Sequence, residues 1–232
     1  MLAKTLAAES AGIRLVHVLS SEWTFKKEIV KSRLRNLLGA GMRTVYARKC
    51  EIREVEPAVS NEFQDENHLQ GHVSSPVNVG LYSGNELVSI MTFGKCRFDK
   101  RHEWELVRFC SKLNTRIIGA AGKLLSHFEK AYNPKSLVTY ADRRWSDGRL
   151  YSKLGFSFVR NSPPNYWYFK NGTNLLESRV KYQKHMLKAR LKRFDPAKTE
   201  IQNMRDNGYS RIFDCGSMVF EKAYKRDAVS GE

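Results

Sequence analysis

The sequence predicts a mixed α/β fold, and three observations support this prediction. Apolar runs of strand length alternate with segments of helical spacing along most of the chain. Between residues 45 and 169 the predicted order is β-α-β-β-β-α-β-α-β-β, which covers about 125 residues, an ordinary size for one domain. The composition, 41% hydrophobic and 11% aromatic, supplies enough apolar surface to offset the conformational entropy lost on folding. It therefore excludes a disordered or fibrous chain.

The first elements follow from local signals near the N-terminus. Residues 13–19 form an apolar run that predicts a buried strand. Ser20 and Ser21 can cap a helix after this run, and that helix is expected to end at Gly39. The next two predicted elements are an extended segment and a helix that opens on a proline, at residues 45–55 and 57–67.

The middle of the chain alternates strands and helices. The sequence Ser83-Gly84-Asn85 predicts a hairpin between strands at residues 77–82 and 86–92. Further strands are predicted at residues 104–110, 137–140, 156–160 and 166–169. Helices are predicted between them at residues 117–131 and 149–154. After residue 171 we expect a basic helix at residues 179–193 and a short helix at residues 199–206. Two strands, at residues 211–213 and 217–220, and a frayed end at residues 225–232 follow.

The positive charge is concentrated in two segments. Lys and Arg number 40 against 24 Asp and Glu, which gives a formal net charge of +16. Residues 26–53 are rich in basic side chains, with only Glu28 and Glu51 against them. Residues 179–193 contain no acid and hold Arg179, Lys181, Lys184, Lys188, Arg190, Lys192 and Arg193. Because a helix of this composition would repel itself, a polyanion such as a phosphate backbone is the expected partner, with a solvated basic surface as the alternative.

Cysteine usage and hydropathy argue against several classes of protein. Four cysteines lie far apart without a CxxC pair, so we expect a reducing compartment and neither a disulfide framework nor a zinc site. His68 and His72 flank Gly71, which makes shared metal ligation from one helix face improbable, and we predict no metal. No run approaches the roughly 18 uncharged apolar residues that span a bilayer. A cytoplasmic protein without a membrane partner is expected.

Two segments of the middle region resemble the GNAT acyltransferase superfamily. Residues 116–121, Arg-Ile-Ile-Gly-Ala-Ala, fit the family's R/Q-x-x-G-x-G/A signature between a strand and a helix, where small residues expose backbone N–H groups to a pyrophosphate. Residues 150–156, LYSKLGF, resemble the family's LYxKLGF segment. The resemblance implies a GNAT-like fold with a central mixed sheet and a tyrosine, Tyr151, that can protonate a leaving thiolate. It also implies acetyl-CoA or a related acyl donor, bound at Arg116, Gly119, Ala120 and Ala121.

Further residues resemble a phage-borne branch of that superfamily, to which the DNA-modifying Mom protein is similar. The matching positions are His68, Arg108 with Glu105, and the YAD stretch that ends at Asp142. The resemblance implies that His68, Arg108 and Asp142 join Tyr151 as catalytic residues in a cleft. Such a cleft would suit proton transfer and an anionic substrate, whereas a groove tyrosine without catalytic function is the alternative for Tyr151.

The run from Gly12 to Phe220 resembles the C-terminal part of phage and intron-associated homing endonucleases, in segments such as GIRLVHVLSSEW, YADRRWSDGRLYSKLGF and NGYSRIFDCG. In those proteins a nuclease core of the PD-(D/E)xK type, similar to very-short-patch-repair nucleases, comes first. Here Glu9 is the one acid before residue 13, and one carboxylate cannot assemble a Mg²⁺ site. We therefore expect a nuclease remnant at residues 1–41, a GNAT-like domain at residues 42–171 and a basic helical extension at residues 172–232. We expect no DNA cleavage by this chain alone.

Three functional hypotheses follow. The first is a DNA-binding protein of homing-endonuclease descent, located in the bacterial host cytoplasm if phage-encoded, that lacks its nuclease core. Double-stranded DNA would be contacted by Lys181, Lys184, Lys188, Arg190, Lys192, Arg193, Arg143 and Arg144, and by the aromatic residues 166–168. The second is a GNAT-type group-transfer enzyme that uses acyl-CoA or modifies a DNA base. The third is a remnant without activity, and the oligomeric state stays open.

Overall fold

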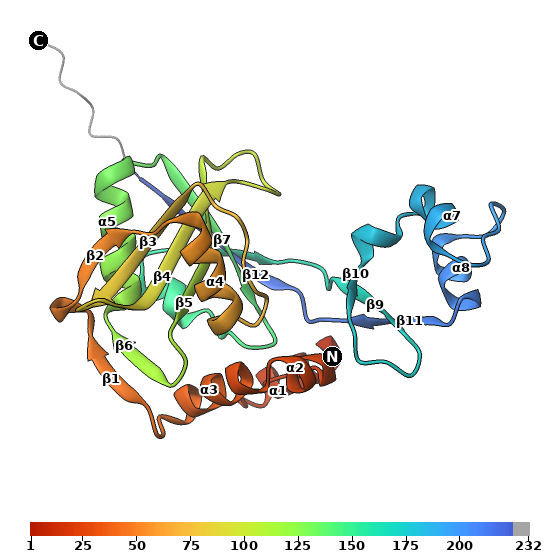
Figure 1. Ribbon diagram of the computed structural model, residues 1–232, viewed down its shortest axis with the longest axis horizontal. Helices are drawn as coiled ribbons and strands as arrows, with labels where there is room; N and C mark the ends of the chain where they lie inside the picture. The colour runs from red at the N-terminus through yellow and green to blue at the C-terminus, as the bar shows by residue number, and fades with distance from the viewer. Residues whose placement is uncertain (225–232) are drawn as a thin grey trace, which may run out of the picture. The chain divides into compact units, whose positions relative to one another are not determined.

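Figure 1 shows a computed structural model of the chain, which describes residues 1–224 of the 232. Two units are built from interleaved segments. Unit 1 holds Met1–Phe25, Asp142–Ser146 and Asn161–Ser217, and unit 2 holds Lys26–Ala141, Asp147–Arg160 and the residues from Met218. These divisions differ from the predicted boundaries at residues 41 and 171, because the chain crosses between the units more than once. The predicted frayed segment, residues 225–232, lies outside the described residues.

A seven-stranded mixed sheet forms the centre of unit 2, as the predicted fold class requires. Its strand order is β2-β3-β4-β5-β7-β12-β8. Strands β2 to β5 pair antiparallel with their neighbours, whereas β5 and β7 pair in parallel. The bounds of the strands, in sheet order, are Glu51–Glu54, Val77–Ser83, Glu86–Lys95, Trp104–Ser111, Ser136–Asp142, Ser217–Ala223 and Ser157–Asn161. β12 therefore lies between β7 and β8, although it follows both in the sequence.

Helices α4 and α5 cover opposite faces of this sheet and span Pro57–Asn67 and Ala120–Tyr132 (Figure 1). Successive side chains of a strand point to opposite faces. Accordingly, Ile90 of β4 packs in a cluster with Phe63 of α4, while Met91 belongs to the larger core that contains α5. Phe128 of α5 stacks on Phe93, with ring centroids 3.6 Å apart. Because burial of one such side chain contributes roughly 1.5–3 kcal/mol, these contacts fix the helix on the sheet.

The central predictions for unit 2 are confirmed. The helix expected at residues 57–67 is α4, and the expected hairpin strands are β3 and β4. Ser83 pairs with Glu86, so the turn has two residues and Gly84 adopts a left-handed φ of 62°. Glycine adopts this conformation without the steric cost that a Cβ adds.

Helix α3 (Lys27–Leu38) belongs to unit 2, although the sequence assigned it to a separate nuclease remnant. The hydroxyl of Ser32 accepts a hydrogen bond from the backbone N–H of Asn114 at 2.8 Å, and Arg35 donates to the Asn114 side chain at 2.8 Å. After α3, strand β1 pairs in parallel with β6, with bounds Arg43–Tyr46 and Thr115–Ile118. The helix is thus tied to the turn that follows β5.

Unit 1 has its own three-stranded antiparallel sheet, in the order β10-β9-β11. These strands span Glu177–Ser178, Tyr166–Lys170 and Tyr209–Phe213. Helices α1, α2 and α8 of this unit span Leu2–Ser10, Ser20–Phe25 and Glu200–Asp206. Its hydrophobic cluster consists of the buried side chains Tyr168, Tyr182, Leu187 and Met204.

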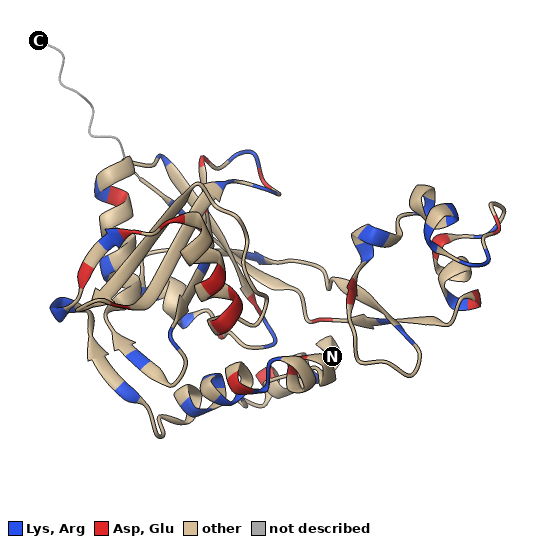
Figure 2. Cartoon of the chain, viewed as in Figure 1, with Lys and Arg blue, Asp and Glu red and all other residues tan. Residues whose placement is uncertain are grey.

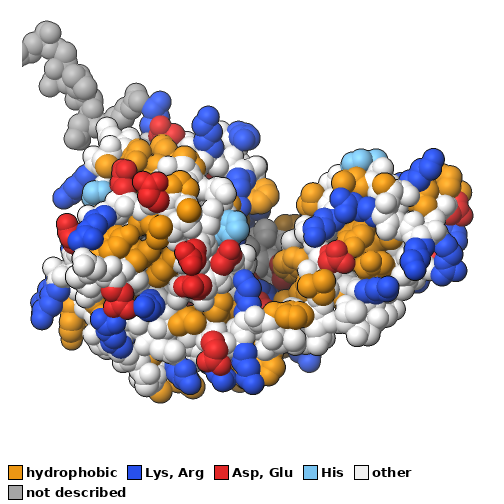
Figure 3. Space-filling model, in the orientation of Figure 1, with side chains coloured by type: hydrophobic (Ala, Val, Ile, Leu, Met, Phe, Trp, Pro, Cys, Tyr) orange, Lys and Arg blue, Asp and Glu red, His pale blue; other side chains and the backbone are white. Residues whose placement is uncertain are grey.

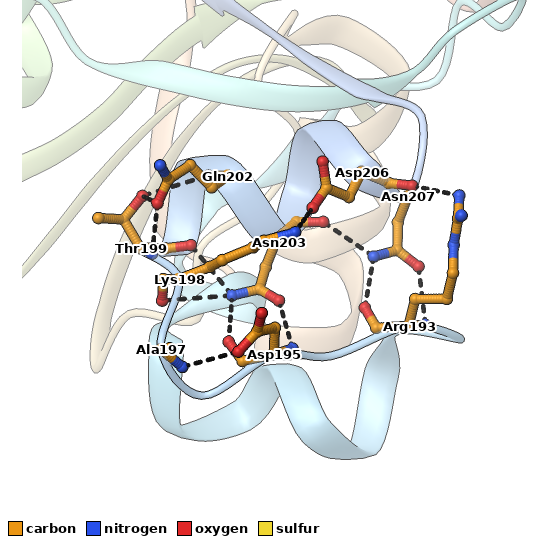
Figure 4. A network of polar contacts seen from close by, with 9 residues as sticks. All are labelled: Arg193, Asp195, Ala197, Lys198, Thr199, Gln202, Asn203, Asp206 and Asn207. Carbon is orange, nitrogen blue, oxygen red and sulfur yellow. Dashed lines mark hydrogen bonds and ion pairs between the residues drawn. The ribbon is translucent and has the colours of Figure 1, made fainter.

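A polar network around Asn203 closes the loop that precedes α8 (Figure 4). The buried Asn203 amide donates to the carbonyl oxygens of Asp195 and Thr199 at 2.9 and 3.1 Å, and its oxygen accepts from the backbone N–H of Asp195 at 2.8 Å. Asn207 donates to the carbonyl oxygen of Arg193 at 2.6 Å and accepts from the Arg193 N–H at 3.1 Å. These bonds satisfy loop backbone groups that water would otherwise have to reach.

Two predicted strands are corrected. Residues 13–19 form no strand; the backbone N–H of His17 instead donates to the carbonyl oxygen of Arg144. Residues 166–169 do lie in a strand, β9, but it pairs with β10 and β11 and not with the central sheet. An apolar run of strand length does not specify which strand it pairs with. β9 had been included in the domain at residues 42–171, whereas the strand that lies between β7 and β8 is β12.

The single basic helix predicted at residues 179–193 is also corrected. The segment forms three short pieces, η2 (Arg179–Tyr182), η3 (Lys184–Met186) and α7 (Leu187–Arg190). Gln183 between the first two is extended, with φ −62° and ψ 143°. Like charges without acidic partners oppose a long helix, and the burial of Tyr182 and Leu187 fixes the segment instead.

We predict that Gly216→Ala destabilises unit 1 far more than Gly172→Ala does. Both glycines have positive φ, 74° and 83°, so both substitutions cost about 1–2 kcal/mol of backbone strain. At Gly216 the added Cβ would also lie 2.2 Å from the carbonyl oxygen of Ser162, whereas nothing lies within 4 Å at Gly172. Urea unfolding of both variants checks this, and equal losses of stability would contradict the close contact at Gly216.

Candidate functional site

The central sheet opens between β5 and β7. These parallel strands pair only through Trp104 with Leu137 and Glu105 with Val138. Beyond that point the hydroxyl of Thr139 donates to the carbonyl oxygen of Leu106 at 3.1 Å, in place of a backbone ladder. The following residues of both strands therefore present backbone edges that the other strand does not use.

A β-bulge in β5 accompanies this opening. Thr92 of β4 pairs with Arg108 and Phe93 pairs with Leu106, so Val107 is the extra residue. A bulge bends its strand and increases the local twist. The bend begins where β5 and β7 stop pairing, and it re-aims the side chain of Arg108.

Tyr151 lies at the opening, on the short helix α6 (Arg149–Lys153) that follows β7. Its ring stacks on Phe220 with centroids 5.3 Å apart, and Phe156 packs edge-on at 6.0 Å. Burial raises the pKa of Tyr151, and a hydrogen bond with Thr139 opposes this by a smaller amount. Since the pKa of an ordinary tyrosine is already about 10, the Tyr151 phenol stays protonated at neutral pH.

Arg108 is half-buried and bonds only backbone carbonyls. Its Nε donates to Gly71 at 3.3 Å and its Nη1 donates to Val107 at 3.0 Å. No ion pair with a carboxylate of residues 1–224 accompanies these bonds. Burial lowers the pKa of Arg108, and repulsion by Arg97 acts in the same direction.

His68 follows α4 directly and is neutral. Burial, together with the positive charges of Arg108, Arg33 and Lys26, lowers the pKa of His68 to about 3. The His68 Nδ1 accepts a hydrogen bond from the backbone N–H of Gln70 at 3.2 Å. In the neutral imidazole this arrangement assigns the proton to Nε2, which is a donor.

Three of the four predicted catalytic residues thus belong to unit 2. The charge of Arg108 acts on both His68 and Tyr151. Asp142, the fourth, belongs to unit 1, where its carboxylate accepts from Arg144 at 2.8 Å. Sequence reasoning missed Arg33, whose charge also acts on His68 and Tyr151; its position one helical turn after the buried Ile29 was the available signal.

The predicted donor site lies at the start of α5. Gly119 is the N-cap of α5 with φ 84°, no side chain caps the helix, and its first turn holds no acid. Gly119 itself is exposed, and a Cβ there would meet only Ala47, at 3.7 Å. Arg116 is exposed on the preceding strand, β6. Ala120 and Ala121 are buried, so these small residues also serve helix packing.

The predicted DNA contacts fall into two groups. The exposed basic residues of unit 1 are Lys181, Lys184, Lys188, Arg190, Lys192 and Arg193. Figure 2 marks the Lys and Arg positions along this part of the chain, and Figure 3 shows basic side chains on its visible face. Arg143 and Arg144 are buried and ion-paired, which corrects the expectation that they contact DNA. Arg143 bonds Glu9 at 2.9 Å and Arg144 bonds Glu22 at 2.9 Å. A buried arginine that is ion-paired within the unit cannot also neutralise a phosphate of bound DNA.

The expectation that the aromatic residues 166–168 stack on DNA bases is partly corrected as well. Tyr168 is 1% exposed and belongs to the core of unit 1. Tyr166 is half-buried, and the guanidinium groups of Arg179 and Arg211 lie 5.2 and 5.1 Å from its ring centroid. Both tyrosine hydroxyls donate to Glu200, at 3.2 and 2.9 Å. Their rings and hydroxyls are engaged within the unit.

Several other features lie outside this site. A cavity of about 450 Å³ in unit 2 contains none of the predicted site residues and is lined by Phe63, Glu66, Asn67, Leu87, Lys112 and Leu113. Within residues 1–224 no three His, Cys, Asp or Glu side chains gather as metal ligands would. No helix in the described part of the chain is long and apolar enough to cross a membrane.

Comparison with known proteins gives only weak similarities. Neither protein-family models nor curated protein sequences gave a match. Among solved structures, an acetyltransferase of Bacillus subtilis in complex with CoA is 15% identical, with TM-score 0.43, and covers 76% of this chain and 100% of its own. Ard1 from Thermoplasma volcanium is 12% identical, with TM-score 0.42, and the match covers 77% of this chain and 99% of Ard1. A GNAT family acetyltransferase from Elizabethkingia anophelis with acetyl-CoA bound is 15% identical, with TM-score 0.41, and the match covers 76% of this chain and 99% of that acetyltransferase.

We predict that the neutral His68 makes stability depend on acidity. The folded pKa is about 3 and the unfolded value is about 6.5, so between these values the unfolded chain binds more protons. The neutral His68 therefore contributes fully to the free energy of unfolding above pH 6.5, and this contribution is lost as the pH falls toward 3. From pH 7 to pH 5 the wild type should lose about 2 kcal/mol more than His68→Gln in urea unfolding. His185→Gln, at an exposed imidazole, is the control, and parallel pH profiles for wild type and His68→Gln would contradict the assignment.

Proposed function

We propose that unit 2 is a group-transfer enzyme of the GNAT type that uses acetyl-CoA or a related acyl donor. The observation that supports this most is the opening between β5 and β7, which has the protonated phenol of Tyr151 at the point where pairing stops. The two segments that resemble the GNAT superfamily both belong to unit 2: residues 116–121 run from β6 into α5, which packs on the central sheet, and residues 150–156 connect β7 to β8 of that sheet.

The chain offers two kinds of contact to such a donor. The uncapped start of α5, with Arg116 before it, would hold the pyrophosphate through backbone N–H groups and a guanidinium. The unpaired edges of β5 and β7 would accept an amide-bearing arm as a further strand would bind. When bound, the donor would supply an activated acyl thioester.

Tyr151 is assigned as the general acid. Its raised pKa keeps the phenol protonated, so it can give a proton to a leaving thiolate, while Thr139 and the stacked Phe220 orient it. His68 is assigned as a hydrogen-bond donor rather than a base, since Gln70 occupies Nδ1 and Nε2 carries the proton. Substrate proton abstraction is left to a group of the acceptor or to water.

We predict that Tyr151→Phe lowers acyl transfer by about 10²-fold or more without weakening the donor complex. Transfer is measured as release of the CoA thiol with double-stranded DNA or a primary amine as acceptor, and donor binding as the thermal shift with acetyl-CoA. Tyr132→Phe, at an exposed ring on α5, is the matched control. Unchanged turnover in Tyr151→Phe would remove the tyrosine from the mechanism. The absence of any shift with millimolar acetyl-CoA would overturn the group-transfer function itself.

A second candidate function is DNA binding through unit 1, in a protein of homing-endonuclease descent. The observation that favours it is the exposure of Lys181, Lys184, Lys188, Arg190, Lys192 and Arg193 in a run that contains no acid. Folding has packed Tyr182 and Leu187 inward and left these charges outside. Such a surface supports a phosphate-backbone interaction, in which double-stranded DNA would be the partner.

We predict that the triple variant Lys181→Ala, Lys188→Ala and Lys192→Ala flattens the salt dependence of DNA binding. Each phosphate contact that is lost reduces the slope of log affinity against log salt by about 0.9. The control replaces three exposed lysines of unit 2, Lys49, Lys135 and Lys153, and removes the same net charge. Fluorescence anisotropy at several salt concentrations makes the comparison. Equal slopes for both triple variants would show that the run is not the interface.

A further inference from the structure

We propose that Arg108 and the Nε2–H of His68 form a binding site in unit 2 for a compact oxyanion, a phosphate or carboxylate group of the acceptor. This assignment of the acceptor class rests on the proposed group-transfer function. Binding of the oxyanion itself does not depend on the donor, so the two can be tested separately.

The guanidinium of Arg108 is the main reason for an anionic ligand. It is half-buried, and its two hydrogen bonds go to the carbonyl oxygens of Gly71 and Val107, which carry no net charge. The adjacent carboxylate, Glu105, is fully buried and already bonds Arg97 through the Arg97 Nε, Nη2 and backbone N–H. A charge moved out of water without an ionic partner is unfavourable, and a bound anion removes that cost.

The loop between residues 68 and 71 holds the site together from both ends. Arg108 donates to the carbonyl oxygen of Gly71, and Lys26 donates to that of His68 at 3.4 Å. Gly71 has φ 66°, and a Cβ there would lie 2.7 Å from the carboxylate of Asp65. Asp65 is itself engaged by His72, through the backbone N–H at 2.9 Å and the ring at 2.7 Å. The nearest carboxylate of the loop is therefore occupied as well.

The remaining groups at the site are hydrogen-bond donors or neutral. His68 presents Nε2–H because its Nδ1 is used. Gly71 joins the two residues, since its backbone N–H donates to the carbonyl oxygen of His68 at 3.0 Å and its own carbonyl oxygen accepts from Arg108. Cys110, two residues after Arg108 on β5, is a buried thiol whose pKa burial raises to about 12. The charged side chains that act on His68 and Cys110 within the described residues are basic. Glu105 is a carboxylate that acts on Arg108, but its oxygens are bonded to Arg97. Donors whose nearby carboxylates are already bonded elsewhere select an oxyanion over a cation or an amine.

The test uses Arg108→Gln, which removes the charge and keeps the polar end, and Arg108→Lys as the conservative variant. Isothermal titration at constant ionic strength uses inorganic phosphate, acetate and a dinucleotide phosphodiester as probes. We expect phosphate or acetate to bind the wild type, at least tenfold weaker binding to Arg108→Gln, and partial retention in Arg108→Lys. Arg160→Gln, at an exposed position of unit 2, should bind as the wild type does. Preference for the dinucleotide would identify nucleic acid as the source of the oxyanion, and preference for acetate a carboxylate acceptor.

Stability and donor binding separate the outcomes. Without anion, Arg108→Gln should be at least as stable as the wild type, because an unneutralised buried charge is removed. No binding of the three probes by the folded wild type, or equal binding to Arg108→Gln, would overturn the oxyanion site. If that happens while acetyl-CoA still shifts the melting temperature, only the acceptor inference fails. If phosphate binding depends on Arg108 but acetyl-CoA gives no shift, the oxyanion site stands and the acyl-transfer function fails.

Discussion

The end of pairing between two parallel strands sets the surroundings of Tyr151 in unit 2. β5 and β7 are joined through Glu105 and Val138 and then separate. The buried ion pair of Glu105 with Arg97 lies at this last joined position, and the bulge at Val107 follows directly. Continued pairing would have consumed the backbone edges and covered Tyr151. The sheet therefore gives up ladder hydrogen bonds at its centre, where the core around it is large enough to compensate.

Unit 1 uses its charges in two different ways. Arg143 and Arg144 face inward and bond Glu9, Glu22 and Asp142, so their charge holds segments of the unit together. The guanidinium of Arg144 is buried between two partly buried carboxylates, whereas the Glu9 partner of Arg143 is exposed. Most cations of residues 179–193 are exposed, although Arg179 lies over the ring of Tyr166 and Arg193 donates to the carbonyl oxygen of Asp206. Net charge alone does not distinguish these two uses, and only burial does.

Local signals in the sequence predicted the elements well, while partners in space were mostly beyond reach. The helix at 57–67 and the hairpin at Ser83-Gly84-Asn85 are specified by a proline, a glycine and short-range periodicity. The strand assigned to residues 13–19 failed because an apolar run does not record whether another strand is available. Within the site, His68, Arg108 and Tyr151 were predicted from motifs. Arg33 was missed, since its helix had been assigned to another domain.

The position of β12 has a consequence for how the protein is made. The strand lies between β7 and β8, yet nearly all of unit 1 is encoded before it. β8 is an edge strand whose neighbour in the sheet is β12, so during synthesis it has no strand to pair with until residues 217–223 have left the ribosome. Until then β7 is the open edge of the sheet while some 55 further residues emerge, and a long loop must close before the sheet is whole. An exposed strand edge of this kind is a site for wrong pairing with other chains, so rapid folding of unit 1 shortens the hazardous interval.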